Sequence, residues 1–505
     1  MGEQLMAAER SYRFGPLERG GVLLGMRWPQ LALLIGVMLC VLGALRSPLV
    51  FVPVWLLLAA GFAFVAFVRV EDRNLDQWVP IVFGFTMQKV TGETVFRGGF
   101  FRLGPGDDRI TRTVLPGPLS TLVMLSVPVG GSRYVAVVKD VKKQTYTAVL
   151  QVKGSQFALL ESGDQQARVD AWGELLAGLT GGGGKLSRIQ WLERTLPDSG
   201  DQLQRHWRVR GHHDDSWASQ AYEQVIDAAG PVAQRHETYL SFQLRAKDAR
   251  RAIQRAGGGD QAACAVLLGE LRTMEAALAR ASISTVGWLP PRALAAVIRT
   301  TYDPYSIEMI DARGGASTDL AGGLKGLPSG IDPAIAGPVR TVNAWDHYRT
   351  DSGFHTTYWI NGWPRVPSPA AFLAPLLMET TCRRTVSLVV EPLPGRKAEK
   401  AVNRRRMAHL GEQQMRDKVG KVTTQRDVAE ADEVERREQE LIAGFGAFRF
   451  HGFVTVSADD LESLADACGE AETLASRSRL EMVRLVGEQD QGFSVGALPL
   501  AVGVA

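Results

Sequence analysis

The sequence predicts a two-helix transmembrane hairpin followed by a cytoplasmic α+β region, in which mixed or antiparallel sheets are layered with helices and carry a charged helical arm. Three observations predict this fold class. Two long apolar runs fill residues 28–68, and β-branched segments alternate with helix-like segments from residue 69 onward. Charges of opposite sign separate along residues 396–443.

Length and composition limit the classes of protein that fit this chain. Its 505 residues exceed what one compact core usually holds, and a hydrophobic content of 45% excludes global disorder. The 57 basic and 54 acidic residues nearly balance, which argues against a protein that coats nucleic acid. The four cysteines lie far apart without a CxxC pair, so we expect neither a disulfide scaffold nor a zinc ribbon.

The apolar runs have the lengths of membrane-crossing helices. Residues 28–45 contain eighteen residues and residues 47–68 contain twenty-two, all uncharged. As helices at roughly 1.5 Å per residue they would measure about 27 and 33 Å, against a hydrocarbon core of about 30 Å. Only Arg46 separates them, so we expect a tight hairpin. A signal peptide would not be followed at once by a second span.

Arginines on both sides of the hairpin predict its orientation. Cytoplasmic flanks of membrane helices are rich in Lys and Arg, so we expect a plasma-membrane protein with two spans and both termini in the cytoplasm. Trp28 has the residue type that anchors a helix at the membrane interface. The flanking arginines are Arg10, Arg13, Arg19 and Arg27 before the hairpin and Arg69 and Arg73 after it, and the expected membrane-interface residues are Arg27, Trp28, Arg46 and Arg69.

The remaining chain divides into two predicted α+β regions after a cytoplasmic segment at 1–27 and the hairpin at 28–68. The first region spans 69–300 and has a small β subdomain near 98–160, where Pro and Gly punctuate β-branched runs. A Gly- and Pro-rich loop or boundary at 301–340 leads to the second region at 341–505. Near its end, Ser457 is predicted to cap a helix that begins with acidic residues.

The second region contains the charged helical arm, at 396–443. Residues 396–426 hold ten basic and three acidic residues, whereas residues 427–440 hold two basic and seven acidic ones. Two interpretations remain open: a solvated pair of helices, or an arm that docks a partner protein. If the arm docks a partner, its best electrostatic contacts are Arg404, Arg405 and Arg406.

No catalytic, cofactor-binding or metal-binding residues are predicted. The Gly-rich string at 178–187 departs from a P-loop, because Leu179 and Leu186 replace the first glycine and the hydroxyl residue. His236-Glu237 begins like a zinc-protease signature, yet Leu240 stands where the second histidine belongs. The cluster at 212–215 (HHDD) lacks a distant pair of ligands and favours a polar loop.

Several strings together resemble known conjugation proteins. The string YRFGPLERGGVLLGMRWPQ, leading into the hairpin, resembles the start of PrgI-like proteins of actinobacterial conjugation loci. The strings at 289–304 (LPPRALAAVIRTTYDP), at 355–365 (HTTYWINGWPR) and near the end of the chain resemble the N-terminal, non-motor domain of the type IV secretion conjugative ATPase. The resemblance implies that domain's fold and a membrane association, whereas the family's nucleotide-binding residues have no matching positions here.

The resemblance implies a non-enzymatic, membrane-anchored structural subunit of a conjugative type IV-like DNA-transfer system. Its cytoplasmic part would be a docking platform for a separate P-loop ATPase. The implied partners are that ATPase, other type IV secretion membrane subunits, the lipid bilayer and further copies of this chain in a homo-oligomer, without direct DNA contact. Two alternatives remain: a scaffold of another secretion system, and a membrane-tethered hydrolase with a site built from distant carboxylates.

Overall fold

The structure is a computed structural model. It describes residues 28–70, 73–98, 110–111, 113–131, 133–153, 160–180, 184–197, 216–229, 234–310, 330–364, 371–393 and 446–503, with a few isolated positions between these ranges. The segment at 1–27 and nearly all of the predicted arm lie outside the described residues.

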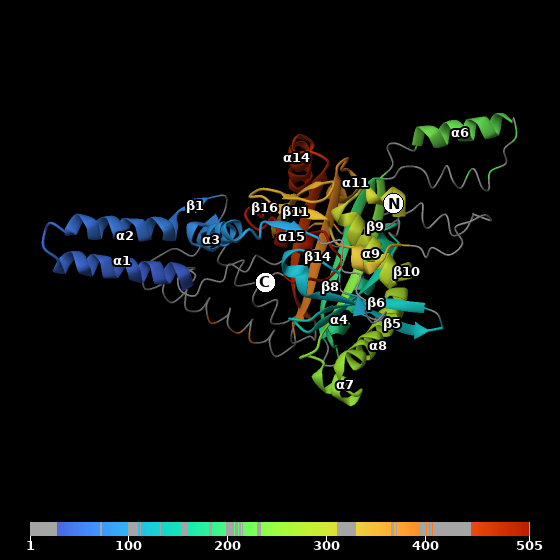
Figure 1. The fold of residues 1–505 in the computed structure, drawn as a ribbon, viewed down its shortest axis with the longest axis horizontal. Helices are drawn as coiled ribbons and strands as arrows, with labels where there is room; N and C mark the ends of the chain where they lie inside the picture. Colours follow the sequence, from blue (N-terminus) through green and yellow to red (C-terminus); the bar gives the residue numbers. More distant parts are fainter. Residues whose placement is uncertain are drawn as a thin grey trace, which may run out of the picture.

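Two apolar helices, α1 (Trp28–Arg46) and α2 (Val52–Phe67), pack side by side and project from the rest of the molecule (Figure 1). The Gln30 side chain donates a hydrogen bond to the Ala66 carbonyl, joining the start of α1 to the end of α2. A Cβ atom at Gly43 would come within 3.1 Å of the Trp55 ring, so glycine allows the two helices to approach closely.

The second predicted span is shorter in the structure than the sequence suggested. Residues 47–51 form the turn, in which the Phe51 N–H donates to the Pro48 carbonyl, and α2 therefore has 16 residues instead of twenty-two. The segment from Pro29 to Arg46 is long and apolar enough to cross a membrane, whereas α2 is apolar but shorter. Among the described residues there is thus one helix that is long and apolar enough to span a membrane.

After the helical pair, the described residues form one large antiparallel sheet of fourteen strands, in the order β3-β11-β12-β13-β15-β14-β8-β9-β7-β6-β5-β4, with β10 beside β7 and β16 beside β13. Strands from both predicted α+β regions therefore share one sheet. The strands are β3 (Val95–Arg97), β4 (Ile110–Thr111), β5 (Leu122–Gly130), β6 (Arg133–Asp140), β7 (Thr145–Val152), β8 (Leu186–Pro197), β9 (Gln234–Arg245), β10 (Thr285–Trp288), β11 (Arg340–Asn343), β12 (Tyr348–Arg349), β13 (Phe354–Gly362), β14 (Arg383–Leu393), β15 (Ala447–Ala458) and β16 (Glu481–Arg484). A separate small pair, β1 (Arg69–Val70) and β2 (Arg73–Asn74), follows α2.

Helices cover the sheet and complete its hydrophobic cores. Apolar side chains of α4 and α8 pack on one face of β7 and β9, while α9 and α15 pack on the opposite face of the same strands. A third core joins α11 and α14 to β13, β14 and β15. The remaining helices are α3 (Leu75–Thr91), α4 (Ser162–Thr180), α6 (Trp217–Ala229), α7 (Arg250–Arg255), α8 (Gly259–Arg280), α9 (Pro291–Tyr302), α11 (Ala374–Met378), α14 (Leu461–Arg477) and α15 (Gln489–Gly496).

Apolar and polar side chains alternate along the central strand β9. In β9, Leu240, Phe242 and Leu244 point into the core under α8, while Ser241 and Gln243 point to the opposite face and are also buried. A period of two residues is the strand signature, since successive side chains alternate between the faces of a sheet. Both faces of the central strands are covered, one by apolar contacts and the other by a mixture of apolar and polar contacts.

One predicted helix start is wrong. Ser457 lies in β15, and the N-cap of α14 is Asp460, whose carboxylate accepts a hydrogen bond from the Ser463 N–H at 2.9 Å. The sheet extends the chain beyond Ser457, because Ser457 pairs with His355 and Arg383 in the neighbouring strands. Three residues later, the carboxylate of Asp460 satisfies an N–H group that the first turn leaves free.

Candidate functional site

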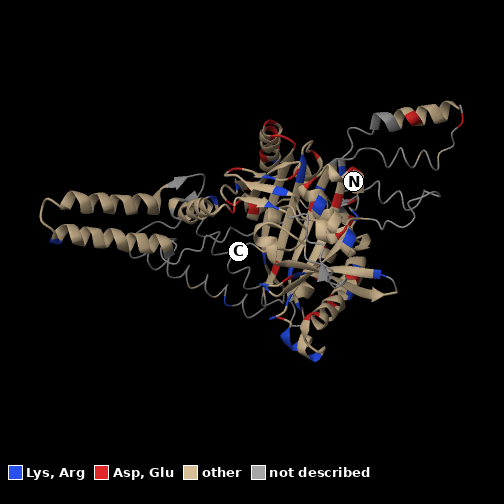
Figure 2. Ribbon diagram, viewed as in Figure 1, with Lys and Arg blue, Asp and Glu red and all other residues tan. Residues whose placement is uncertain are grey.

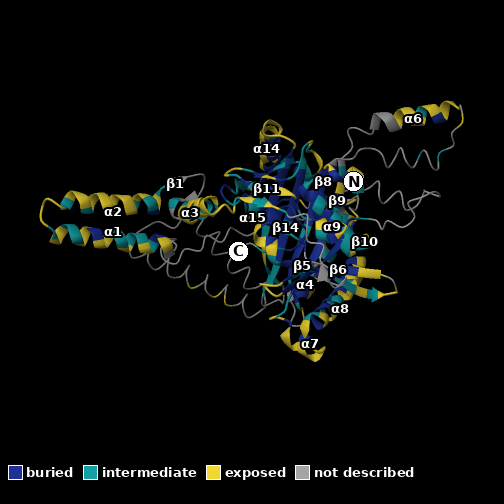
Figure 3. Cartoon of the chain, in the orientation of Figure 1, coloured by how far each residue is buried: buried dark blue, intermediate teal, exposed yellow. Residues whose placement is uncertain are grey.

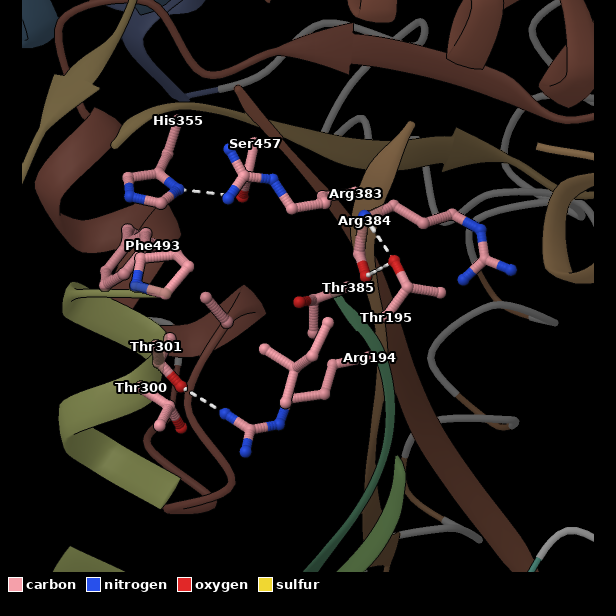
Figure 4. A pocket seen from close by; sticks show the side chains of 13 residues that line it. Arg194, Thr195, Thr300, Thr301, His355, Arg383, Arg384, Thr385, Ser457 and Phe493 are labelled. Carbon is pink, nitrogen blue, oxygen red and sulfur yellow. Dashed lines mark hydrogen bonds between the residues drawn. The ribbon is translucent and has the colours of Figure 1, made fainter. Parts of the chain in front are cut away.

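A small cavity with charged and hydroxyl-bearing walls lies where the ends of β8 and β14 meet β13, β15, α9 and α15 (Figure 4). The volume open to water is about 20 Å³, which is room for roughly one water molecule. Thirteen residues from segments far apart in the sequence line it: Arg194, Thr195, Leu196, Thr300, Thr301, Pro304, His355, Arg383, Arg384, Thr385, Ser457, Phe493 and Ala497.

His355 on β13 lies at one side of the cavity and is 2% exposed. Its Nδ1 lies 2.8 Å from the Ser457 hydroxyl and its Nε2 lies 2.8 Å from the Thr350 hydroxyl, and its ring packs against Phe493 with 4.7 Å between centroids. Burial, and to a smaller degree the charge of Arg383, lowers the pKa of His355 to about 3. The imidazole is therefore neutral near pH 7, with one ring nitrogen donating and the other accepting.

The histidine should make stability depend on pH. The unfolded chain takes up a proton at His355 near pH 6.5, whereas the folded chain does so only near pH 3. The neutral His355 therefore contributes to the free energy of unfolding fully above about pH 6.5. This contribution is lost as pH falls, by up to about 1.4 kcal/mol per pH unit. We expect urea unfolding of the detergent-solubilised protein to show this loss between pH 6.5 and 5. The variant His355→Gln should flatten it, and an unchanged slope in that variant would contradict the assignment.

Each of the three arginines of the cavity already has an acidic partner. Arg194 contacts Glu237, Arg383 contacts Asp459, and Arg384 contacts Glu193 with 2.7 Å between Nη1 and Oε2. The positive charges are thus neutralised within the protein, and the cavity does not present an uncompensated cationic surface to a ligand. The residues around the cavity therefore have a structural role: they attach α9 and α15 to the sheet.

A second polar cluster binds the C-terminal segment to the sheet. Gln190, which is fully buried, donates to the Ser387 hydroxyl and to the carbonyls of Val495 and Leu498, and it accepts from the Ala501 N–H at 2.7 Å. These bonds place residues 495–501 against β8 and β14. The neighbours Arg188, Ser241 and Gln243 add bonds to the carbonyls of Ala501 and Pro499.

Of the residues that the sequence predicted as sites, the structure describes three: Trp28, Arg46 and Arg69. Arg46 is exposed at the end of α1, and Arg69 lies in β1. Trp28 is the first residue of α1, and Arg27 lies outside the described residues. The predicted docking residues Arg404, Arg405 and Arg406 also lie outside them.

His236 and Glu237, which begin like a zinc-protease signature, make contacts within the sheet. His236 contacts Glu193, with Nδ1 2.6 Å from Oε1, while Glu237 accepts from Arg194 and Tyr239. Of the cluster at 212–215, only Asp214 is described, and it accepts hydrogen bonds from Ser216 and Ser219. Within the described ranges, no group of three or more His, Cys, Asp or Glu side chains is arranged to hold a metal ion.

Sequence reasoning missed the buried polar residues of the central strands. Arg188, Gln190 and Arg194 occur at even spacing in β8, and Ser241 and Gln243 repeat the pattern in β9. Polar residues that alternate with Ile, Leu and Phe are usually assigned to a solvated sheet face. One signal could have indicated their burial. Most of these side chains are long enough to reach distant partners, and the strands that carry them lie between predicted helices that could cover both faces of the sheet.

Comparison with known proteins adds no relative: no protein-family model matches the chain, and no curated protein matches it. The fold, the polar cavity and the Gln190 cluster therefore place the protein in a structural class: a large antiparallel sheet domain that carries an apolar helical pair.

Proposed function

We propose that this protein is a non-enzymatic, membrane-anchored structural subunit of a conjugative, type IV-like DNA-transfer system, in which the sheet domain docks a separate P-loop ATPase. One observation supports the anchor above all others. The helical pair turns its large apolar side chains outward, and among residues 28–68 only Arg46 is charged. Figure 3 shows the exposed positions along α1 and α2, and Figure 2 shows that charged residues are concentrated on the sheet domain instead.

This exposure is more than a soluble monomer usually tolerates. Leu45, Leu49, Val50 and Leu57 are each at least 75% exposed. Contiguous apolar patches of this kind mark contact with a membrane or with another protein. Lipid would cover the side chains of both helices, and a crossing by both would place the Arg46 turn outside and the two arginine-bearing flanks in the cytoplasm.

The assignment to DNA transfer rests on the sequence resemblance. Its segments meet in one place: Tyr302 of α9 and His355 of β13 pack against Phe493 of α15, with ring centroids 5.2 and 4.7 Å apart. The three strings that resemble the ATPase domain therefore pack together in one structural unit. A sheet domain fixed by such long-range contacts is suited to present a rigid surface to a motor protein, which supports a role as a platform.

A mild-detergent affinity purification of the full-length protein from its native membrane tests the proposal. We expect a P-loop ATPase of the conjugation type to co-purify in near-stoichiometric amount, together with other secretion subunits. An oligomeric bait without an ATPase would favour a scaffold of another secretion system. A monomeric bait that hydrolyses a substrate would contradict the proposal and favour the membrane-tethered hydrolase.

The anchor makes a prediction of its own. Leu39 is 59% exposed near the middle of α1, so Leu39→Arg should leave helix packing intact while placing a charge near the bilayer centre. We expect a substantial fraction of this variant to be extracted from membranes by alkaline carbonate. The matched variant Leu45→Arg, beside Arg46 at the helix end, should resist extraction because the side chain can reach the interface. Equal behaviour of the two variants would contradict insertion of α1.

The docking prediction concerns the arginine triplet. Replacing Arg404, Arg405 and Arg406 together with glutamate should weaken capture of the ATPase, because it reverses the charge offered to an acidic partner. Monomer folding should remain intact, since exposed charges contribute little to stability. Capture of the ATPase at low salt by the variant and by the wild type is the measurement. Equal capture would leave the arm as a solvated segment.

A further inference from the structure

Helix α3 (Leu75–Thr91) connects the helical pair to the sheet domain and packs on that domain with one face. Trp78 stacks with Trp345, with 6.2 Å between ring centroids, and Phe85 meets the same ring edge-on at 5.1 Å. Gln88 accepts a hydrogen bond from the Asn343 side chain at 3.2 Å. The positions 78, 85 and 88 lie on one side of a helix, so this side is fixed to the domain.

The opposite side of α3 presents large apolar side chains that no described part of the chain buries. Its large side chains are 46–78% exposed, and they follow the spacing i, i+3, i+4, i+8 and i+11 of a single helical face. From residue 79 to residue 88 the chain carries no charge. The exposed residues are Val79, Val82, Phe83, Met87 and Val90. A soluble helix that packs on a domain with one face normally turns charged residues outward on the other.

The position of α3 points to what covers this face. Only seven residues separate the end of α2 from the start of α3, and the Leu75 N–H donates to the Val68 carbonyl at 3.1 Å. In Figure 1, α3 is seen nearly end-on at the base of the pair, whereas α1 and α2 are seen from the side, so α3 runs across their direction. If the pair follows the membrane normal, α3 lies along the membrane surface.

We propose that α3 is an interfacial helix whose apolar face enters the boundary between lipid headgroups and acyl chains, while its other face holds the sheet domain. This inference rests on the proposed membrane anchor and adds a second attachment to lipid. A helix in the interface plane buries its apolar face roughly 5–10 Å deep. Because α3 starts seven residues after the apolar pair ends and is hydrogen-bonded to that end, the bilayer that would hold the pair is the occupant we assign to the apolar face of α3. The sheet domain would then be held at a fixed height and tilt above the membrane instead of swinging on a linker.

Spin labels on the full-length protein test this arrangement. Cys382→Ser removes the half-buried thiol, while the buried Cys40, Cys264 and Cys468 stay in place. Burial raises the pKa of the Cys264 thiol to about 12, which slows its labelling. In this background, Phe83→Cys is labelled with a nitroxide, and the protein is reconstituted in vesicles of equal parts phosphatidylcholine and phosphatidylglycerol. Relaxation by oxygen, which concentrates in lipid, is compared with relaxation by a water-soluble nickel chelate.

Two matched labels separate this inference from the anchor. Glu93→Cys, exposed in the turn after α3, reports water, and Leu42→Cys, half exposed in α1, reports the anchor. We expect oxygen to dominate at positions 42 and 83 and the nickel chelate to dominate at position 93, with unchanged circular dichroism. Oxygen dominating at 42 alone would overturn the interfacial helix and leave the anchor standing. Low access of both reagents at 83 would also overturn it, because a protein would then cover α3. Stronger relaxation by the nickel chelate than by oxygen at both 42 and 83 would overturn the anchor as well.

Discussion

Replacing Glu237 with alanine is expected to destabilise the sheet domain by about 3–5 kcal/mol, because it leaves a buried arginine without its counter-charge. Glu237 Oε2 accepts from Arg194 Nη2 at 2.7 Å and from the Tyr239 hydroxyl at 2.6 Å, and both residues of the ion pair are less than 10% exposed. Burial would raise the pKa of Glu237, but Arg194 and Arg235 together hold it below its ordinary value. Urea unfolding of the detergent-solubilised full-length protein measures the loss.

A neighbour provides the control for this variant. Arg235 also pairs with Glu237, at 2.8 Å, but its side chain is 33% exposed. Arg235→Ala should therefore cost no more than about 1 kcal/mol. The double variant Arg194→Met with Glu237→Leu should be more stable than Glu237→Ala, since no unpaired charge remains buried. A cost for Glu237→Ala as small as that of Arg235→Ala would mean that water reaches the site.

Replacing Gln190 with leucine is expected to release the C-terminal segment from the sheet. The side chain of Gln190 is fully buried. It donates hydrogen bonds to the Ser387 hydroxyl and to two carbonyls, and it accepts one from the Ala501 N–H. Leucine has a similar volume and can form none of these bonds. The Ala501 N–H then loses its acceptor, whereas the Leu498 carbonyl keeps the Leu500 N–H and the Ser387 hydroxyl keeps the Val495 carbonyl. A buried polar group left without a partner costs about 1–3 kcal/mol, so we expect a loss of that size, with faster hydrogen exchange concentrated in residues 495–501.

The matched control for Gln190→Leu is Gln254→Leu, at an exposed position of α7. A surface change of this kind should stay within about 0.5 kcal/mol of the wild type. Exchange that rises evenly across the sheet, instead of at 495–501, would show that Gln190 stabilises the domain as a whole and does not attach the segment specifically.

The pattern of residues predicted the strands of the central sheet well. The segment at 186–197 (LSRIQWLERTLP), predicted as a strand, is β8 in the structure, and the strands predicted at 235–246 (RHETYLSFQLRA) and 385–394 (TVSLVVEPLP) correspond to β9 and β14. These segments are long and rich in β-branched or alternating apolar residues, so local preference and burial agree. The helix predicted at 260–280 is α8, which begins one residue earlier.

The two polar clusters could not be predicted from the sequence, because their partners are distant along the chain. Gln190 and Ala501 are more than 300 residues apart, and Arg194 meets the Val297 carbonyl only because α9 crosses the end of β8. No local rule specifies which strands become neighbours. The sequence shows that Arg194 and Glu237 lie in strands, whereas pairing between β8 and β9 at Arg194 and Glu237 makes them an ion pair.

What the sequence by itself determined is the division into an apolar N-terminal pair and a charged α+β part, since hydropathy and periodicity are properties of neighbouring residues. Tertiary structure decided the rest. It shortened the second apolar helix to 16 residues through the turn at 47–51, and it joined the two α+β regions into one sheet. It also buried polar side chains of the strands against the C-terminal segment. The joined sheet and the buried polar side chains depend on contacts between residues far apart in the chain, which are specified only when the whole chain has folded, whereas the turn at 47–51 is local.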